Sequence, residues 1–260
     1  MIYLKTKREI ELIKEACRIT KGMLDVVEKN IKPGISTLEL DKIAEDYCRS
    51  QGAIPNFKNY GGFPGSICAS IDDVVVHGIP RADIILKEGQ IISIDCGAMI
   101  RGFNGDAART FPVGKISAEK QKLIDVTKQS FFEGIKELKV GDRIGDIGER
   151  VQKYAESFGF SVVREMVGHG IGRHLHEDPQ VPNYGHKGFG PRIENGLVIA
   201  VEPMINMGKK EIEIDDDEWT TRTRDGKPSA RYENTIAITD DGVEILTLYA
   251  RADGIARLRV

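Results

Sequence analysis

The sequence has no run of apolar residues close to the roughly 20 that a membrane-spanning helix needs. Its first residues, Met1 to Glu9, become charged at once and contain no apolar signal region. It also has little excess charge, because 37 lysines and arginines face 40 aspartates and glutamates, for a net charge of −3. These absences argue against a helical membrane protein and against a basic nucleic-acid-binding or membrane-surface protein. We expect a cytoplasmic protein.

Cysteine is scarce and unpaired in the sequence. None of the four cysteines, Cys17, Cys48, Cys68 and Cys96, forms a Cys-x-x-Cys pair, so neither a zinc knuckle nor a thioredoxin-type motif is indicated. In the cytosol such cysteines stay reduced. Cys17 and Cys48 fall among the apolar positions of helical patterns, and we expect them in the core.

The length of 260 residues and the hydrophobic content of 40% allow one large domain with a substantial core. No low-complexity linker divides the chain, so a single domain over residues 1–260 is expected. Capping boxes at Thr6 and Ser36, each followed by helical apolar spacing, predict two helices that end near Gly34 and Gly52. Further helices are predicted at 117–138 and 145–158. The predicted strands are 66–71 and 74–77, taken as a hairpin, then 89–95, 107–111, 160–167, 197–202 and 231–239.

The chain contains an internal repeat. A shift of 107 residues places Tyr47 on Tyr154 and Gly52 on Gly159, and it places Asp95 on Glu202. The repeated halves would be about 7–113 and 114–250. Two helices followed by strands, twice, predict an α+β fold with approximate two-fold symmetry, in which each half ends an apolar strand with an acid.

The segment from Val167 to Val181 is the most unusual in the chain. It holds three of the five histidines, His169, His174 and His176, and glycines alternate with other residues at its start. Glycine permits close approach of the backbone, and histidine is the commonest side-chain metal ligand. A Gly-His-Gly sequence therefore indicates a histidine at a crowded, chemically active point.

Four acids lie in apolar strand patterns, where carboxylates are rare unless they are paired or bound to metal. They are Asp95, Asp106, Glu202 and Glu233. Each alone would also fit a turn cap or an ion pair with arginine or lysine. Together, four carboxylates cannot converge without counter-charge, and a pair of divalent cations supplies it. With His169, such oxygen-rich ligation suits Mn, Fe or Co, and two such ions can activate water for hydrolysis.

His77 and His176 remain outside this set of ligands. A lone histidine is more often a hydrogen-bonded loop residue, but near such a centre a neutral imidazole can also contact a substrate carbonyl or leaving amine. Trp219, the single tryptophan, fits either a core anchor or the lining of a pocket.

Seven motifs carry a resemblance to a known family. The chain resembles the type I methionine aminopeptidases, which are pita-bread metallopeptidases, from about Lys5 to about Leu248. The motifs are Val75-Val76-His77-Gly78-Ile79-Pro80, Ile94-Asp95, Gly102-Phe103-Asn104-Gly105-Asp106, Gly168-His169-Gly170-Ile171-Gly172-Arg173, His176-Glu177-Asp178-Pro179-Gln180-Val181, Glu202-Pro203-Met204 and Ser229-Ala230-Arg231-Tyr232-Glu233. The resemblance implies a pita-bread fold, an antiparallel sheet with helices on its outer face, which agrees with the repeat.

The resemblance also implies the roles of the site residues. Asp106 and Glu233 would bridge two divalent ions, Asp95 would complete one site, and His169 with Glu202 would complete the other. Glu202 would also carry protons for the attacking water. His77 and His176 would position the scissile carbonyl and its amide.

The family removes the initiator methionine of nascent chains when the next residue is small, and it implies contact with the ribosome. Its methionine pocket maps onto Phe57, Tyr60, Phe63, Cys68, Leu175 and Trp219. Gly61 departs from members that carry histidine there, and Phe57 and Leu175 also vary from a common pattern. A structural monovalent-cation site would map onto Asp72, Val74 and Ser229. We expect a minimal, bacterial-type enzyme that is a monomer.

Three other readings of the sequence compete with this one. A prolidase or aminopeptidase P shares the five ligands, but those enzymes usually carry an additional N-terminal domain, as do creatinase-like amidinohydrolases. A catalytically inactive pita-bread module that binds partners would have lost metal ligands, whereas all five are present here. Cleavage of Xaa-Pro peptides, or the absence of any metal-dependent hydrolysis, would distinguish these alternatives.

Overall fold

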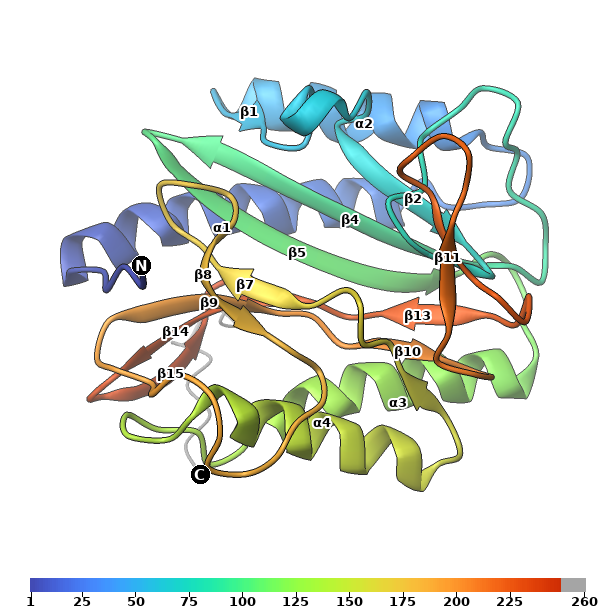
Figure 1. Ribbon diagram of the computed structural model, residues 1–260. Coiled ribbons are helices and arrows are strands. Elements are labelled where there is room, and N and C mark those ends of the chain that lie inside the picture. The colour runs from blue at the N-terminus through green and yellow to red at the C-terminus, as the bar shows by residue number, and fades with distance from the viewer. Residues whose placement is uncertain (249–260) are drawn as a thin grey trace.

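Each half of the chain contributes a pair of helices (Figure 1). In the computed structural model, which describes residues 1–248, α1 (Lys7–Glu28) and α2 (Thr37–Ser50) begin at the predicted capping boxes. The second pair is α3 (Ala118–Ile135) and α4 (Ile144–Ser157). Helix α3 ends before the predicted residue 138, because Lys136 has an extended ψ of 130° and Glu137 then adopts a left-handed backbone conformation with φ of 59°. The remainder of the expected domain, 249–260, lies outside the described residues.

The helices preserve the repeat. The bounds of α2 and α4 are displaced by 107 residues at both ends, as the shift of the sequence requires. The same shift carries the start of β4 (Ile91–Ile100) onto β9 (Leu197–Val201). It fails farther along, because residues 207–228 add two strands, β11 and β12, before the chain returns to the centre.

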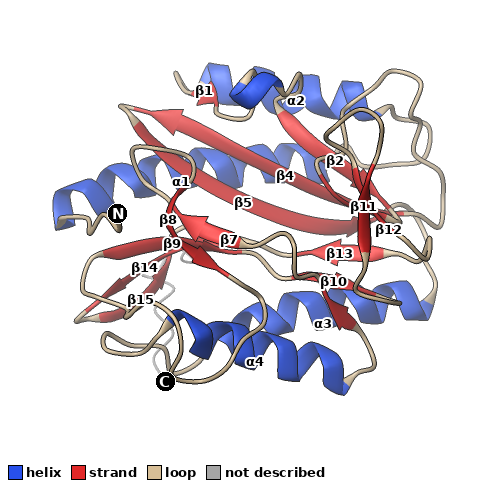
Figure 2. Ribbon diagram, in the orientation of Figure 1, coloured by secondary structure: helices blue, strands red, loops and turns tan. Residues whose placement is uncertain are grey.

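The strands form antiparallel ladders between the helix pairs (Figure 2). One sheet has the order β1-β4-β2 with β5 on β4, and another has the order β15-β14-β9-β7-β8. Two smaller sheets are β13-β10-β6 and β11-β12-β3. The bounds not yet given are β1 (Ile54–Pro55), β2 (Ile67–Ile71), β3 (Val74–Val76), β5 (Phe103–Pro112), β6 (Ser161–Val162), β7 (Gly168–Gly170), β8 (Glu177–Val181), β10 (Met204–Asn206), β11 (Ile212–Ile214), β12 (Thr221–Thr223), β13 (Ser229–Arg231), β14 (Asn234–Thr239) and β15 (Gly242–Ile245).

Each helix pair covers its own part of the sheet structure. Helix α1 packs on β4 and β5, and α3 packs on β10 and β13. The core beneath the first pair includes Leu24, Leu40 and Ile94, and the core beneath the second includes Ile147 and Ile199. The expected α+β arrangement is therefore confirmed. None of the described helices has the length and apolar character to cross a membrane.

Two predictions about the strands are wrong. The strand expected at 89–95 does not end at an acid, because β4 continues to Ile100 and Asp95 lies in its middle. Apolar residues continue beyond the acid, and β4 pairs with strands on both sides. The hairpin of β2 and β3 is also absent, since β2 pairs with β4 and β3 pairs with β12. In the turn between them, Asp72 donates its backbone N–H to the carbonyl oxygen of Ile91 at 3.0 Å.

Two further strands are shorter than predicted. The run at 160–167 contains only β6, and the run at 231–239 is split into β13 and β14 on either side of Tyr232 and Glu233. All four cysteines are free and buried, as expected for Cys17 and Cys48.

Candidate metal centre

Two of the acids come from one antiparallel strand pair, β4 and β5. Asp95 lies opposite Ala108, and Gly97 lies opposite Asp106. Residues two apart on a strand share a face, as do directly opposed residues, so both carboxylates project to the same side. Both are almost completely buried, with 4% and 2% of their surface exposed.

The second half supplies the other two acids and the histidine. Glu202 follows β9 directly, and Glu233 lies in the break between β13 and β14. His169 lies in β7, which is held between β8 and β9. A Cβ on Gly168 would lie 2.3 Å from the carbonyl oxygen of Ala200, and the glycine on the other side of His169 is equally confined. The glycines therefore let both neighbouring strands approach the histidine.

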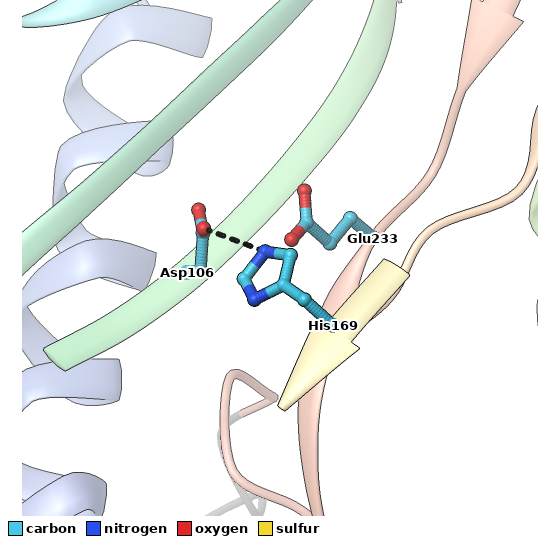
Figure 3. A group of neighbouring side chains, drawn as sticks. All are labelled: Asp106, His169 and Glu233. Atoms are coloured by element: carbon cyan, nitrogen blue, oxygen red, sulfur yellow. Dashed lines mark ion pairs between the residues drawn. The ribbon is translucent and has the colours of Figure 1, made fainter. Parts of the chain in front are cut away.

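The ligand atoms of Asp106, His169 and Glu233 lie within 4.8 Å of one another (Figure 3). The Nε2 atom of His169 is 3.7 Å from Asp106 Oδ2 and 3.7 Å from Glu202 Oε1. The Nδ1 atom of His169 is 2.9 Å from the carbonyl oxygen of Gly170. A carbonyl oxygen only accepts hydrogen bonds, so Nδ1 carries the proton. The Nε2 atom, which is the ring nitrogen near Asp106 and Glu202, therefore keeps a free lone pair.

The electrostatics of the cluster favour the binding of a cation. Burial raises the pKa of Asp95, which reaches about 7, and that of Asp106, and the neighbouring carboxylate of Glu233 reinforces both shifts. Burial likewise raises the pKa of Glu202 and Glu233. Burial lowers the pKa of His169 to about 4, so its imidazole is neutral at neutral pH. Buried acids with raised pKa values beside a neutral imidazole are suitable ligands for divalent cations.

Unpaired oxygen atoms support the same interpretation. Asp95 Oδ1, Asp106 Oδ1 and Glu233 Oε1 are buried and have no hydrogen-bond partner. Buried polar atoms are rarely left unsatisfied, and three in one cluster call for an ion or an ordered water. The donor set therefore fits the divalent ions expected from the sequence.

Arg231 also belongs to the cluster, although no role was predicted for it from the sequence. Its Nη1 donates to Asp95 Oδ2 at 2.5 Å, and its Nη2 donates to Glu202 Oε2 at 2.6 Å and to Glu233 Oε2 at 2.7 Å. The side chain is 6% exposed. The signal was present in the sequence, because Arg231 lies two residues before Glu233 in an extended segment, where alternate residues share a face.

The cluster opens into a cavity of about 710 Å³. All six residues of the expected methionine pocket line it, namely Phe57, Tyr60, Phe63, Cys68, Leu175 and Trp219. Aromatic contacts build its wall: the ring centroids of Phe63 and Trp219 are 5.2 Å apart in an edge-to-face arrangement. The cavity thus joins the polar cluster to a largely apolar chamber.

His77 and His176 both line this cavity. His77 has a left-handed backbone with φ of 59° and is 6.3 Å from the Trp219 ring. Burial lowers its pKa to about 4. The Nδ1 atom of His176 is 2.9 Å from the Tyr60 hydroxyl, and its ring is 4.3 Å from that of His169. A strained backbone such as that of His77, held in place by the surrounding structure at a cavity, is typical of a functional residue.

Other residues were missed or given no role by the sequence. His174, Met1 and Tyr3 also line the cavity. The side chain of Asp178, another lining residue, pairs with the N-terminal ammonium group. No periodic pattern marks these residues, because they meet only through the fold.

The residues of the expected monovalent-cation site are partly assembled. The backbone N–H of Ser229 donates to the carbonyl of Asp72 at 2.8 Å. The ammonium group of Lys120 lies 2.6 Å from Asp72 Oδ1. A positive charge of the chain itself therefore already neutralises this carboxylate.

Comparisons with known proteins agree on one family. A model described as metallopeptidase family M24 matches residues 11–240. The chain is 52% identical to the methionine aminopeptidase of Clostridium acetobutylicum, over 95% of this chain and 99% of that protein. It is 51% identical to methionine aminopeptidase 1 of Bacillus subtilis, with the same coverage of both.

Solved structures show the same relationship. Methionine aminopeptidase from Thermotoga maritima superposes with a TM-score of 0.94 at 41% identity, over 96% of this chain and all of that one. The Rickettsia prowazekii enzyme gives a TM-score of 0.93 at 40% identity, over 95% of this chain and 100% of that one. An Xaa-Pro dipeptidase from Bacillus anthracis, 24% identical with a TM-score of 0.77, shares the fold, but this chain spans 62% of it.

Proposed function

Because the chain belongs to metallopeptidase family M24, we propose that it hydrolyses the first peptide bond of proteins that begin with methionine and have a small second residue. One observation carries the proposal: the neutral His169 and three buried acids, Asp95, Asp106 and Glu202, line a cavity that aromatic and apolar residues also line, and the fourth acid, Glu233, lies beside Asp106 and His169. Its relatives at 52% and 51% identity, which match it over nearly their whole length, are methionine aminopeptidases.

The acids and His169 are proposed to hold two divalent ions, for which Co, Mn and Fe all fit the ligands. Asp106 and Glu233 would bridge them, Asp95 would complete one site, and His169 with Glu202 the other. Two such ions lower the pKa of a bound water and polarise the scissile carbonyl. The unpaired oxygens of Asp95, Asp106 and Glu233 support this assignment.

The remaining polar residues are proposed to act on protons and on the substrate. Glu202 takes the proton of the attacking water and passes it to the leaving amine. His77 and His176 are neutral donors that position the carbonyl and its amide, which the low pKa of His77 supports. Neither histidine needs to ionise between pH 5 and 8 for that role.

The substrate's thioether side chain is proposed to lie among Phe57, Tyr60, Phe63, Cys68, Leu175 and Trp219. Methionine is flexible and polarisable, and sulfur–aromatic contacts favour it in such a chamber. The biological substrates would be nascent chains in the cytoplasm, met near the ribosome by a monomeric enzyme. Co-sedimentation with ribosomes and light scattering would test these two points.

A peptide series tests the proposal. Met-Xaa-Ser peptides, with Xaa graded from Gly to Leu, are incubated with metal-free protein under anaerobic titration of Mn, Fe or Co. Cleavage should require metal and should fall by at least tenfold as Xaa grows from Ala to Leu. Hydrolysis of Xaa-Pro peptides without cleavage of Met-Ala-Ser would point instead to a prolidase-like enzyme, and no hydrolysis with any metal would point to an inactive binding module.

A further inference from the structure

Arg231 forms a hydrogen bond with only one of the two oxygens in each of three carboxylates. Asp95, Glu202 and Glu233 each give one oxygen to its guanidinium group, through Oδ2, Oε2 and Oε2. The second oxygens of Asp95 and Glu233 have no partner, and Oε1 of Glu202 is 3.7 Å from the Nε2 atom of His169. The guanidinium therefore occupies one set of oxygens and leaves the other set for ligation.

We propose that Arg231 is a resident cation of the metal centre, which holds these three carboxylates by one oxygen each and weakens the binding of the second divalent ion. The inference rests on the proposed two-metal site. It makes Arg231 a positioning residue, because it touches the ligands and not the reacting atoms.

The argument follows from charge. When the four carboxylates are ionised, as ligation of metal requires, they carry a formal charge of −3 together with the guanidinium instead of −4. After one divalent ion has bound, the second meets a net charge of −1 with Arg231 and −2 without it. A guanidinium does not lose its proton in a protein, and charges buried together interact strongly. The first ion is still bound by a strongly negative cluster, so the main effect falls on the second.

Arg231 affects metal binding less through the positions of the ligands than through its charge. Asp95 is fixed in the middle of β4, which is paired on both sides, and His169 and Asp106 make no contact with the guanidinium in the hydrogen bonds described. Removing the side chain frees an oxygen on each of three acids, which adds ligand atoms. The loss of the positive charge and the gain of free carboxylate oxygens both favour tighter binding of the second ion in a variant without the guanidinium.

The test is calorimetric titration of metal-free protein with Mn²⁺, with free Mn²⁺ counted independently by electron paramagnetic resonance. The wild type should bind one ion tightly and a second at least tenfold more weakly. Arg231→Gln should bind the second ion at least tenfold more tightly than the wild type. Arg231→Lys, which keeps the charge, should stay within threefold of the wild type. Arg222→Gln is the matched control, because Arg222 pairs with Asp73 and Asp215 instead of the cluster.

Each outcome has one meaning. Two equal affinities in the wild type, or unchanged or weaker second binding in Arg231→Gln, would overturn the role of Arg231 while leaving the metal site intact. No binding of Mn²⁺, Fe²⁺ or Co²⁺ by the wild type would defeat the proposed function itself. If circular dichroism shows that Arg231→Gln does not fold, Arg231→Lys decides, since a tenfold tightening there would contradict the proposal.

Discussion

At the scale of single residues, the centre depends on the contrast between one neutral imidazole and four acids that resist ionisation. His169 contributes a lone pair without adding charge, because burial holds its pKa at about 4. The acids, in contrast, add negative charge when they ionise. Burial raises the pKa of each acid, and one cation of the chain, Arg231, already lies among them.

Replacing Asp106 tests the site directly. Asp106→Asn removes a ligand proposed to bridge both ions, so divalent-metal affinity should fall by at least a hundredfold and turnover should be lost. The metal-free variant should be no less stable than the wild type, because the substitution relieves repulsion among buried carboxylates. Metal titration and thermal unfolding measure the two effects.

Asp41 provides the matched control for this variant. It is also a buried aspartate, but it accepts from the backbone N–H groups of Ser66 and Ile67 at 2.7 and 3.0 Å. Asp41→Asn should lower stability by about 1 to 3 kcal/mol while leaving metal binding unchanged. Metal binding retained in Asp106→Asn would contradict the ligand assignment.

Replacing His77 separates substrate positioning from metal binding. His77→Ala should lower kcat by about 10² to 10⁴, the usual contribution of a positioned proton donor, with metal content unchanged. Steady-state kinetics and metal analysis of the same preparation measure both. His174→Ala, at the same cavity but without a proposed role, should stay within threefold of wild-type kcat. Loss of metal from the His77 variant would mean that its role is misplaced.

At the scale of elements, close backbone packing presents the histidine. Strand β7 lies between β8 and β9, and a Cβ on Gly170 would lie 2.2 Å from the carbonyl oxygen of Asp178. The alternating glycines are therefore a requirement of strand spacing, since neither residue has a positive φ. The buried pair of Lys5 and Glu177, 2.5 Å apart, anchors the adjoining loop that carries His176.

Helix α2 is tied to the cavity wall through Glu45. Its carboxylate accepts from Lys58 at 2.6 Å, from Arg49 at 2.7 Å and from Ser66 at 2.9 Å. These hydrogen bonds outweigh burial and lower the pKa of Glu45 to about 2. A depressed folded pKa stabilises the protein above the unfolded value near 4.5, and the contribution is lost as pH falls from there through about 2.

Glu45→Gln should therefore reduce the free energy of unfolding by about 1 kcal/mol at pH 7. The difference from the wild type should shrink as pH falls below about 4.5. Denaturant unfolding at pH 7, 4 and 3 measures this. Asp46→Asn, whose partner Lys42 lies on the same helix and is exposed, should change stability by less than about 0.5 kcal/mol. An equal loss of unfolding free energy in Glu45→Gln and Asp46→Asn would contradict the proposal that the hydrogen bonds of Glu45 stabilise the fold more than an exposed ion pair does.

At the scale of the whole molecule, the metal centre joins the two halves of the chain. Asp95 and Asp106 come from β4 and β5, whereas His169, Glu202 and Glu233 come from the second half. Ions bound there would link strands that are distant in sequence. Metal binding should consequently stabilise the whole fold, because only the folded chain assembles the ligands.

Thermal unfolding tests this coupling. Mn²⁺ at a hundred times its Kd should raise the free energy of unfolding by about 2.7 kcal/mol and Tm by about 5 to 10 °C. At one fixed Mn²⁺ concentration the gain should be larger at pH 7.5 than at pH 5, because burial raises the pKa of Asp95 to about 7 and this ligand ionises only as pH rises through that value. Asp106→Asn should show no gain. An equal shift in that variant would mean that the ion stabilises some other part of the protein.

Much of this protein is determined by local patterns in the sequence. Capping boxes and helical periodicity define α1 and α2, and the shift of 107 residues correctly relates α2 to α4. The acids and His169 were found because carboxylates within apolar strands and a histidine between glycines are costly unless they serve a site. The six pocket residues came from motif resemblance, and the fold brings all of them to one cavity.

The rest was decided by tertiary structure, because strand partners and buried charges are not local properties. Nothing in the sequence near Asp72 reveals that β2 pairs with β4 while β3 pairs with β12. Periodicity could not place Asp95 in mid-strand, since a carboxylate is tolerated there only when a cavity and counter-charge lie on its face. Arg231 likewise acquires meaning only when three acids from distant strands surround its guanidinium group. The sequence alone indicated the four acids and the histidine of the centre, and long-range pairing decided how their charges are balanced.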